Sequence, residues 1–270
     1  MGLEVHVPRD QAAPAIEVRK VCKSFGAEPV LAHVDVIVRR GETTVLLGPS
    51  GSGKSTLCRI MVGLEMPDSG QLWLHGQPWL VRDDPRHPPR VHRNYRAMRL
   101  RLGMVFQEYT LFPQMTVREN VALAPRKVLR LPRADVEART EEVLRRVGLW
   151  EKADSYPAHL SGGQKQRAAI ARELAMRREI LFLDEATSAL DPELIGEVLD
   201  VVRELAADGM TMVIVTHEMH FASQVATRVV FMDRGLIIEA GTAKSFFESP
   251  TDPRAKQFLG RVGGHETSGS

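Results

Sequence analysis

Cysteine is nearly absent from this 270-residue chain, which contains only Cys22 and Cys58. Residues 1–15 hold charges and two prolines but no apolar core of the kind that a secretory signal needs. We therefore expect both cysteines to be reduced thiols in the cytoplasm, because a disulfide requires matching geometry and an oxidising compartment. This composition excludes a small secreted domain that depends on disulfides.

Long apolar runs and a dominant charge are lacking as well. No run approaches the ~18 residues of a membrane span, so we expect that the chain does not cross a membrane by itself. Lys and Arg number 36 against 34 Asp and Glu, and this net charge of +2 is too even to indicate nucleic-acid binding. Basic residues do cluster at 87–101, which we interpret as a solvated face.

A phosphate-binding pattern is the most informative feature that the chain does contain. Residues 48–56 fit G-x-x-x-x-G-K-[ST] and follow the apolar run 44–47. Glycines let backbone N–H groups point at an anion, and the helix that follows adds its positive end. Lys54 can reach the β- and γ-phosphates, and Ser55 can ligate Mg²⁺. We therefore expect a nucleoside triphosphate, ATP, to be held by Gly48, Pro49, Ser50, Gly51, Ser52, Gly53, Lys54, Ser55 and Thr56.

Strand-like and helix-like segments alternate in the second half of the chain. Helical patterns at 164–176 and 192–207 are followed by apolar strands at 180–183 and 212–215. Strands that alternate with helices around a phosphate loop predict an α/β fold with a mainly parallel sheet.

The first half of the chain is less regular. Short extended runs occupy 16–38, and the last of them, 34–38, alternates in the manner of an edge or half-exposed strand. Residues 77–94 are rich in Pro, Arg, His and Asp without periodicity, so we predict an inserted loop there. A largely helical region follows at 117–147, in which Pro132 and Asp135 mark a helix start.

Two further motifs suit a nucleotide hydrolase. The apolar run 180–183 ends in Asp184 and Glu185, so that one acid can reach Mg²⁺ and the next can polarise a water. Many strands end in acids, so this pair alone is weak evidence for nucleotide hydrolysis. It becomes strong evidence because the chain also contains the phosphate loop. Residues 160–164, L-S-G-G-Q, open a helix with a second anion-binding turn. One small nucleotide does not need two such turns, so we expect Ser161 and Gly163 to complete the site of another subunit; the alternative is an ordinary N-cap.

Taken together, these motifs resemble the ATP-binding cassette family. They are residues 48–56, 160–164, 180–185, 188–191 and 216–217, in that family's order and spacing. The resemblance covers roughly 16–260 and implies a single nucleotide-binding domain with flexible tails at 1–15 and 261–270. It further implies a P-loop NTPase core with a mainly parallel sheet, an N-terminal antiparallel β subdomain and a helical subdomain inserted at roughly 104–165.

The resemblance also implies roles for individual residues. Phe25 is similar to the aromatic that stacks on adenine, and Gln107 to the glutamine that senses Mg²⁺ and couples to the membrane partner. Asp184 resembles the metal-associated acid, Glu185 the catalytic base, and His217 the histidine that contacts the γ-phosphate. In isolation Phe25 could be core, Gln107 a surface amide and His217 a strand-end histidine.

The family further implies a head-to-tail dimer, formed by two copies or with a second ATPase subunit. Each ATP would lie between one subunit's phosphate loop and residues Ser161, Gly162, Gly163 and Asp191 of the other. Closure would align water, Glu185 and Mg²⁺, and hydrolysis would let the dimer reopen.

Within the family, the chain resembles the polar amino acid uptake group. The similar segments are 104–107, 111–120, 216–222 and 246–250. The 107 positions from Lys54 to Ser161 leave no room for the long coiled coil of chromosome-maintenance relatives.

Two segments depart from the uptake group. Residues 108–110 read E-Y-T where Phe-Asn is common at the last two positions, and 77–94 is longer than in many members. Neither segment identifies the solute.

The resemblance implies an ATP-hydrolysing importer subunit at the cytoplasmic face of the inner membrane. It would energise uptake of polar amino acids, ectoine-like compatible solutes or opines. Its partners would be membrane permease subunits and, indirectly, an extracytoplasmic solute-binding protein, with no nucleic acid. One alternative is a membrane-remodelling ATPase of the cell-division or lipoprotein-release type. A nucleic-acid ATPase that uses the Arg-rich segment is another.

Overall fold

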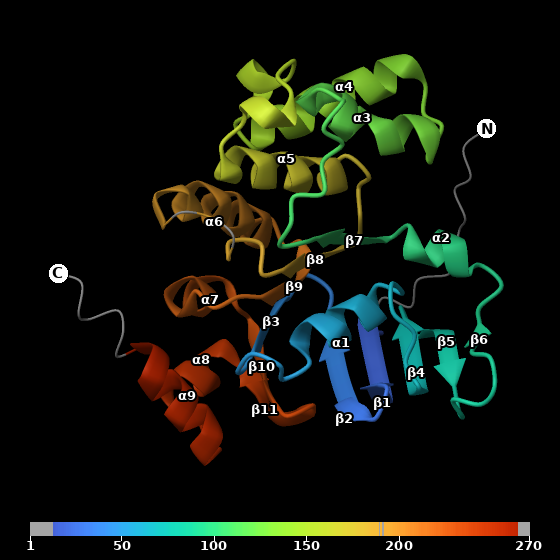
Figure 1. Cartoon of the computed structure of the whole chain (residues 1–270), viewed down its shortest axis with the longest axis vertical. Coiled ribbons are helices and arrows are strands. Elements are labelled where there is room, and N and C mark those ends of the chain that lie inside the picture. The colour runs from blue at the N-terminus through green and yellow to red at the C-terminus, as the bar shows by residue number, and fades with distance from the viewer. Residues whose placement is uncertain (1–12, 189, 191, 264–270) are drawn as a thin grey trace.

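Two β-sheets and a group of helices make up the computed structural model, which describes residues 13–188, 190 and 192–263 (Figure 1). The first sheet is antiparallel, with the order β2-β1-β4-β5-β6. Its strands are β1 (Ile16–Phe25), β2 (Glu28–Val38), β4 (Ser69–Leu74), β5 (Gln77–Arg82) and β6 (Arg90–Val91). The edge strand expected at 34–38 is confirmed, because β2 lies at one end of this sheet.

The second sheet has the order β11-β10-β3-β9-β8-β7. All its neighbouring strands run parallel except the β10–β11 pair, which confirms the predicted α/β fold with a mainly parallel sheet. Its strands are β3 (Thr43–Leu47), β7 (Leu102–Val105), β8 (Ile180–Asp184), β9 (Thr211–Val215), β10 (Arg228–Asp233) and β11 (Leu236–Thr242).

Helices cover the parallel sheet and extend beyond it (Figure 1). They are α1 (Lys54–Met61), α2 (Tyr95–Arg99), α3 (Val117–Lys127), α4 (Arg133–Arg146), α5 (Gly162–Leu174), α6 (Pro192–Ala207), α7 (Met219–Val225), α8 (Ala243–Glu248) and α9 (Pro253–Gly263), with short 3₁₀ turns η1 (Trp150–Lys152) and η2 (Pro157–His159). None of the helices that the structure describes has the length and apolarity needed to span a bilayer.

The parallel sheet separates two hydrophobic cores. Because side chains alternate along a strand, Leu46 and Phe182 face one core while Val45 and Leu181 face the other. The first core lies against α1 and the antiparallel sheet, and the second lies against α3, α5 and α6. Strands buried on both faces read as continuous apolar runs, which explains the sequence of β3 and β8.

The prediction of a loop across 77–94 is wrong. Residues 77–82 form β5, which pairs with β4 through the turn at His75 and Gly76, both of which have positive φ. Trp79 is fully buried in β5 and stacks on Tyr95 with the ring centroids 5.0 Å apart. The polar composition of residues 77–94 hid the apolar pattern of this strand, whose large aromatic side chain packs in the core.

Both cysteines are free thiols, and they differ in environment. Cys22 is half-buried in β1, whereas burial raises the pKa of the Cys58 thiol well above its ordinary value. Asp191 and most of the two expected tails lie outside the described residues.

Candidate active site

The phosphate loop connects β3 to α1 in a backbone shape that only glycine tolerates at two positions. Gly48 has φ +144°, and a Cβ placed there would lie 2.0 Å from the carbonyl oxygen of Met232. Gly53, with φ +98°, precedes the first residue of α1, and a Cβ there would meet the carbonyl oxygen of Val30 at 2.8 Å. These constraints place the N-terminus of α1 directly after the loop, where a helix favours an anion.

Lys54 is a buried cation at that helix start, only 4% exposed. Its Nζ donates to the carbonyl oxygens of Gly48 and Pro49 at 2.9 and 2.8 Å and to Ser52 Oγ at 3.3 Å. Burial lowers the pKa of Lys54, so its charged form is held there at a cost. An anionic phosphate beside Nζ would offset that cost, and the loop therefore fits a triphosphate.

Ser55 and Asp184 meet although 129 positions separate them in the chain. Ser55 Oγ donates to Asp184 Oδ1 at 2.7 Å, and the Asp184 side chain is almost fully buried at the end of β8. Burial raises the pKa of Asp184, against the lowering effect of the Ser55 hydrogen bond and the Arg59 charge. The Ser55 hydroxyl and the Asp184 carboxylate are oxygen ligands of the kind that Mg²⁺ prefers. Phosphate and water oxygens commonly supply the other ligands of this ion.

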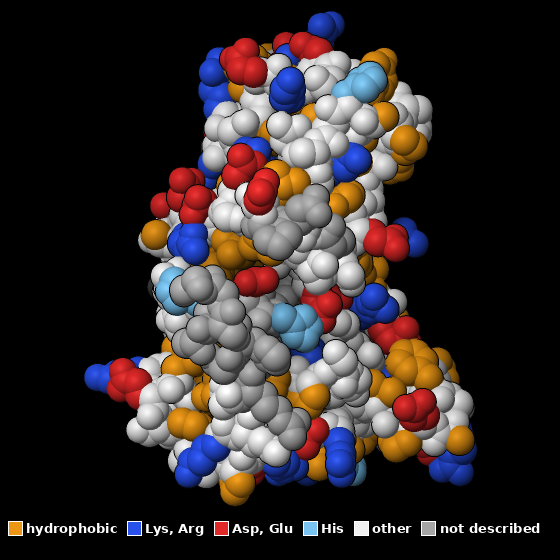
Figure 2. Space-filling view, turned by 60° about the vertical axis from the view of Figure 1, so that its left-hand side comes forward, with side chains coloured by type: hydrophobic (Ala, Val, Ile, Leu, Met, Phe, Trp, Pro, Cys, Tyr) orange, Lys and Arg blue, Asp and Glu red, His pale blue; other side chains and the backbone are white. Residues whose placement is uncertain are grey.

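A cleft opens beside this pair, and all of the predicted metal and catalytic residues except His217 line it. It is lined by Ser55, Arg59, Phe106, Gln107, Glu108, Thr110, Asp184 and Glu185. In the space-filling view, acidic side chains and a histidine gather near the middle of one face, between the helical group and the sheets below (Figure 2). The structure thus brings Gln107, Asp184 and Glu185 together as the sequence predicts.

Glu185 and His217 form a side-chain hydrogen bond at the carboxyl ends of β8 and β9. Glu185 Oε1 lies 3.0 Å from His217 Nε2, and both side chains are partly exposed. The backbone of Glu185 has φ +50° and donates its N–H to the carbonyl oxygen of Val215 at 3.0 Å. Ligand sites of α/β sheets lie at this end of the strands, and Glu185 of this pair lines the cleft.

The loop 106–116, which carries Gln107, is hydrogen-bonded to helices α3 and α5. Asn120, fully buried in α3, accepts the N–H of Phe112 and donates to three loop carbonyl oxygens. Gln166 of α5 donates to another loop carbonyl at 3.1 Å. Arg172 donates to the carbonyl oxygen and hydroxyl of Thr110 at 2.7 and 2.9 Å. Movement of α3 and α5 would therefore be transmitted to Gln107.

The turn that the sequence predicts to bind a second anion begins α5. Ser161 is its N-cap, with Oγ accepting the Gln164 N–H at 3.2 Å and the Gln164 side chain accepting the Ser161 N–H at 3.1 Å. A Cβ on Gly162 would lie 3.0 Å from the Tyr109 hydroxyl. None of residues 161–163 lines the cleft among the described residues. The half-exposed Phe25 lies outside that lining too, at the end of β1.

Sequence reasoning missed Arg59, which lines the same cleft as Ser55. The signal was available, because Arg59 follows Ser55 by four positions on α1 and residues at that spacing share a helix face. It also missed Lys23, whose contacts depend on residues more than forty positions away. No local pattern reveals that arrangement.

A glycine loop between β3 and α1, a buried Ser–Asp pair and an adjacent glutamate define the chain as a P-loop nucleoside triphosphatase. The family described as ABC transporter matches residues 31–188, more than half of the chain. The chain belongs to the ABC transporter family and is an ATPase of that family.

Relatives match almost from end to end. The glutamine transport ATP-binding protein GlnQ of Geobacillus stearothermophilus is 48% identical over 246 residues, which cover 91% of this chain and 98% of the relative. The arginine transport ATP-binding protein ArtM of Bacillus subtilis is 48% identical over 92% of this chain and 99% of its own. The L-cystine transport system ATP-binding protein TcyN of Escherichia coli is 48% identical over 91% and 97%.

Solved structures agree with the fold. CbiO1 from Clostridium perfringens, part of an ABC transporter complex, superposes with a TM-score of 0.77 at 28% identity and covers 94% of this chain and 99% of its own. A dimeric ATP-binding cassette in a post-hydrolysis state, bound to ADP and Pi, gives a TM-score of 0.72 at 29% identity and covers 84% and 98%.

Proposed function

We propose that this chain is the ATP-hydrolysing subunit of a bacterial importer for polar amino acids or related compatible solutes. The convergence of Ser55, Asp184, Glu185 and Gln107 on one cleft carries the hydrolytic part of the proposal. Support for the solute class comes from relatives named for glutamine, arginine and L-cystine transport, which match this chain nearly end to end.

The chain's own residues divide the chemistry of phosphoryl transfer to water. Lys54 and the backbone of the phosphate loop bind the β- and γ-phosphates, and Phe25 stacks on the adenine. Ser55, Asp184 and Gln107 would hold Mg²⁺, which would neutralise developing phosphate charge. Glu185 accepts the proton of the attacking water as the P–O bond to ADP breaks, and His217 orients that carboxylate and contacts the γ-phosphate.

The site is completed by a second ATPase subunit in a head-to-tail dimer. Ser161, Gly162 and Gly163 present the N-terminus of α5 to the partner's ATP; Asp191, which lies outside the described residues, is the fourth residue assigned to that contact. The solved dimeric cassette with bound ADP and Pi supports a dimer. The partner is a second copy or a related ATPase subunit.

The dimer works at the cytoplasmic face of the cell membrane, docked on permease subunits that receive solute from an extracytoplasmic binding protein. ATP holds the dimer closed because it binds the closed form more tightly, and hydrolysis releases it. The alternative of a division or lipoprotein-release ATPase keeps the same site chemistry but changes the membrane partner.

A pull-down tests the transport assignment. Tagged Glu185→Gln chain, with ATP and Mg²⁺, is incubated with detergent-solubilised membranes of the native host, and bound proteins are identified by mass spectrometry. Recovery of a short permease supports an importer, and the amino acids that bind its companion solute-binding protein identify the substrate. Recovery of a division or lipoprotein-release protein overturns the transport assignment while leaving the ATPase intact.

A further inference from the structure

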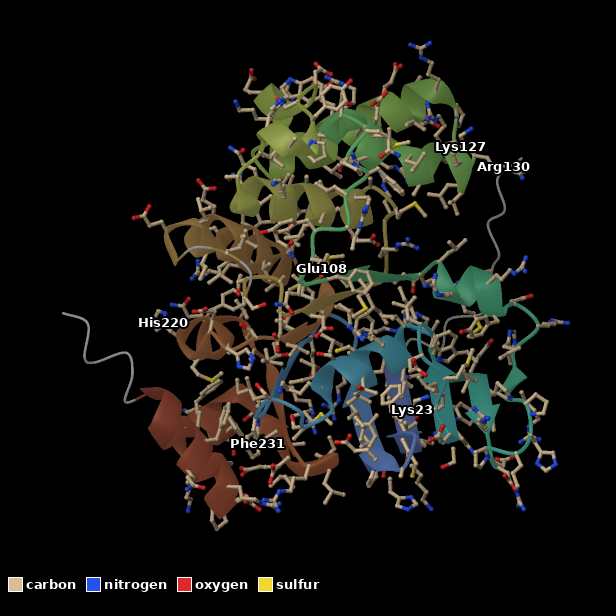
Figure 3. The ribbon with its side chains drawn as sticks, in the orientation of Figure 1. Lys23, Glu108, Lys127, Arg130, His220 and Phe231 are labelled. Atoms are coloured by element: carbon tan, nitrogen blue, oxygen red, sulfur yellow. The ribbon has the colours of Figure 1, made fainter. Side chains whose placement is uncertain are left out.

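Lys23 holds a buried ammonium group beneath the exposed ring of Phe25. The Lys23 side chain is only 9% exposed as a residue, and its Nζ lies 4.9 Å from the centroid of the Phe25 ring. Nζ donates to Glu65 Oε1 at 2.6 Å and to the carbonyl oxygen of Met66 at 2.9 Å. Figure 3 shows Lys23 on the side of the molecule formed by β1, β2 and β4.

The turn at 65–68 fixes both the ammonium and the strand that carries the ring. Asp68 Oδ1 lies 3.9 Å from Lys23 Nζ, while its Oδ2 accepts the N–H of Ser24 at 2.7 Å. The N–H of Asp68 donates to the carbonyl oxygen of Cys22 at 2.8 Å. The end of β1 is therefore clamped on consecutive residues immediately before Phe25, so the position of the ring is set from below.

The Phe25 side chain is exposed to solvent, whereas the Lys23 side chain is buried. Phe25 is 51% exposed, and a Cβ on the following Gly26 would meet nothing within 4 Å. A cation on one face of a ring is attracted by the negative face of the π-system and draws electron density toward itself. The face of the Phe25 ring opposite Lys23 would then become a better partner for an electron-rich purine.

We propose that Lys23 is a positioning residue of the adenine platform. It orients the Phe25 ring and polarises its face for the base, without touching the nucleotide itself. This proposal rests on the proposed function, in which Phe25 stacks on adenine. A merely structural alternative is that Lys23 only ties β1 to the turn at 65–68.

A double-mutant cycle separates the two roles. Binding of the non-hydrolysable analogue AMP-PNP and of tripolyphosphate is measured by titration calorimetry for Lys23→Met, Phe25→Ala and the double variant. We expect Lys23→Met to raise the Kd for AMP-PNP about three- to tenfold and to leave the Kd for tripolyphosphate unchanged. The loss should disappear in the Phe25→Ala background, because the ammonium then has no ring to act on.

A second variant covers the case in which Lys23→Met destabilises the chain by leaving Glu65 and Asp68 unpaired. Glu65→Gln keeps the ammonium and loosens its tether, and its side chain is one-third exposed, so folding tolerates the change. It should weaken AMP-PNP binding in the same direction and less. Lys20→Met, on the exposed side of β1, is the matched control and should bind both ligands as the parent does.

The outcomes are distinguishable. If Phe25→Ala leaves AMP-PNP affinity unchanged, the stacking role of Phe25 is wrong and the proposal for Lys23 fails with it. If Phe25→Ala weakens binding but Lys23→Met and Glu65→Gln do not, only the positioning role of Lys23 is overturned. Equal losses for AMP-PNP and tripolyphosphate would identify a general structural effect and overturn it as well.

Discussion

Glu185 Oε1 and His217 Nε2 lie 3.0 Å apart although the two residues are 32 positions apart in the chain. They follow β8 and β9, which are parallel neighbours, and the N–H of Glu185 donates to the carbonyl oxygen of Val215 at the end of β9. The backbone therefore sets the separation, and the side-chain hydrogen bond does not have to create it. Such a pair holds the carboxylate in one orientation at the mouth of the cleft that also contains Ser55 and Asp184.

Glu185→Gln should abolish turnover without disturbing that geometry. Glutamine has the same shape and keeps a hydrogen-bonding partner for His217, but its amide cannot accept a proton from water. We expect ATP hydrolysis, measured as phosphate release, to fall by about 10²- to 10⁴-fold while ATP binding is retained and the dimer persists in size-exclusion chromatography. Glu108→Gln is the matched control, since Glu108 is an exposed carboxylate on the same cleft with no assigned role. Normal turnover in Glu185→Gln would remove Glu185 as the base.

Asp184→Asn should make the nucleotide-free protein more stable while it destroys hydrolysis. Burial raises the pKa of Asp184 above its ordinary value of 3.8, so the folded state holds the ionised form at a cost near neutral pH. The amide still accepts from Ser55, and it removes that cost. Phosphate release should fall at least about 10²-fold, because the carboxylate beside Ser55 is lost as a metal ligand.

The pH dependence of this stability difference has a fixed sign. A group whose folded pKa is raised favours folding at low pH, and this contribution is lost as pH rises from about the ordinary pKa through the folded value. Urea unfolding of the parent and Asp184→Asn should therefore diverge as pH rises from about 4, with the variant more stable at neutral pH. Asp154→Asn is the control of opposite sign, because Arg118 lowers the pKa of Asp154. A less stable Asp184→Asn at neutral pH would contradict the argument.

The sequence predicted the parts of the fold that local patterns encode. The strands β3, β8 and β9 are buried on both faces, so their apolar runs are visible without any knowledge of their neighbours. β5 was missed because its short apolar run, which includes the fully buried Trp79 and Leu80, opens a segment that is otherwise polar, and its partner β4 lies beyond a turn. Pairing of that kind depends on long-range contacts that periodicity does not record.

The candidate site also has parts that local motifs predict and a part that depends on the order of the strands. Lys54, Ser55, Asp184 and Glu185 belong to short contiguous motifs, which the structure brings to one place through the parallel order of the sheet. The hydrogen bond between Glu185 and His217 could not be derived from spacing, because it depends on β8 and β9 being neighbours.

Ser161→Ala should reduce ATP-dependent dimerisation by more than the loss of a helix cap explains. Ser161 and Thr116 form equivalent capping boxes at the starts of α5 and α3, with Gln164 and Glu119 as the reciprocal partners. Removing either cap should lower the free energy of unfolding by about 1 kcal/mol. Only Ser161→Ala should reduce ATP-dependent dimerisation of the Glu185→Gln chain, measured by light scattering. Equal dimerisation of Ser161→Ala and Thr116→Ala would show that Ser161 serves its own helix alone.

Gly48→Ala should damage the phosphate loop far more than Gly51→Ala, although both residues lie in the same loop and have positive φ. A Cβ on Gly48 would lie 2.0 Å from the Met232 carbonyl oxygen, a backbone atom that can retreat only by shifting β10, whereas a Cβ on Gly51 meets nothing within 4 Å. We expect Gly51→Ala to cost about 1 kcal/mol of unfolding free energy from backbone strain alone. Gly48→Ala should cost about 1–3 kcal/mol more, because overpacking is added, and should weaken ATP binding at least tenfold. Urea unfolding and calorimetric titration with ATP measure both effects. Similar values for the two variants would show that the loop relaxes around Gly48, and that its tight approach to β10 does not hold the phosphate-binding shape.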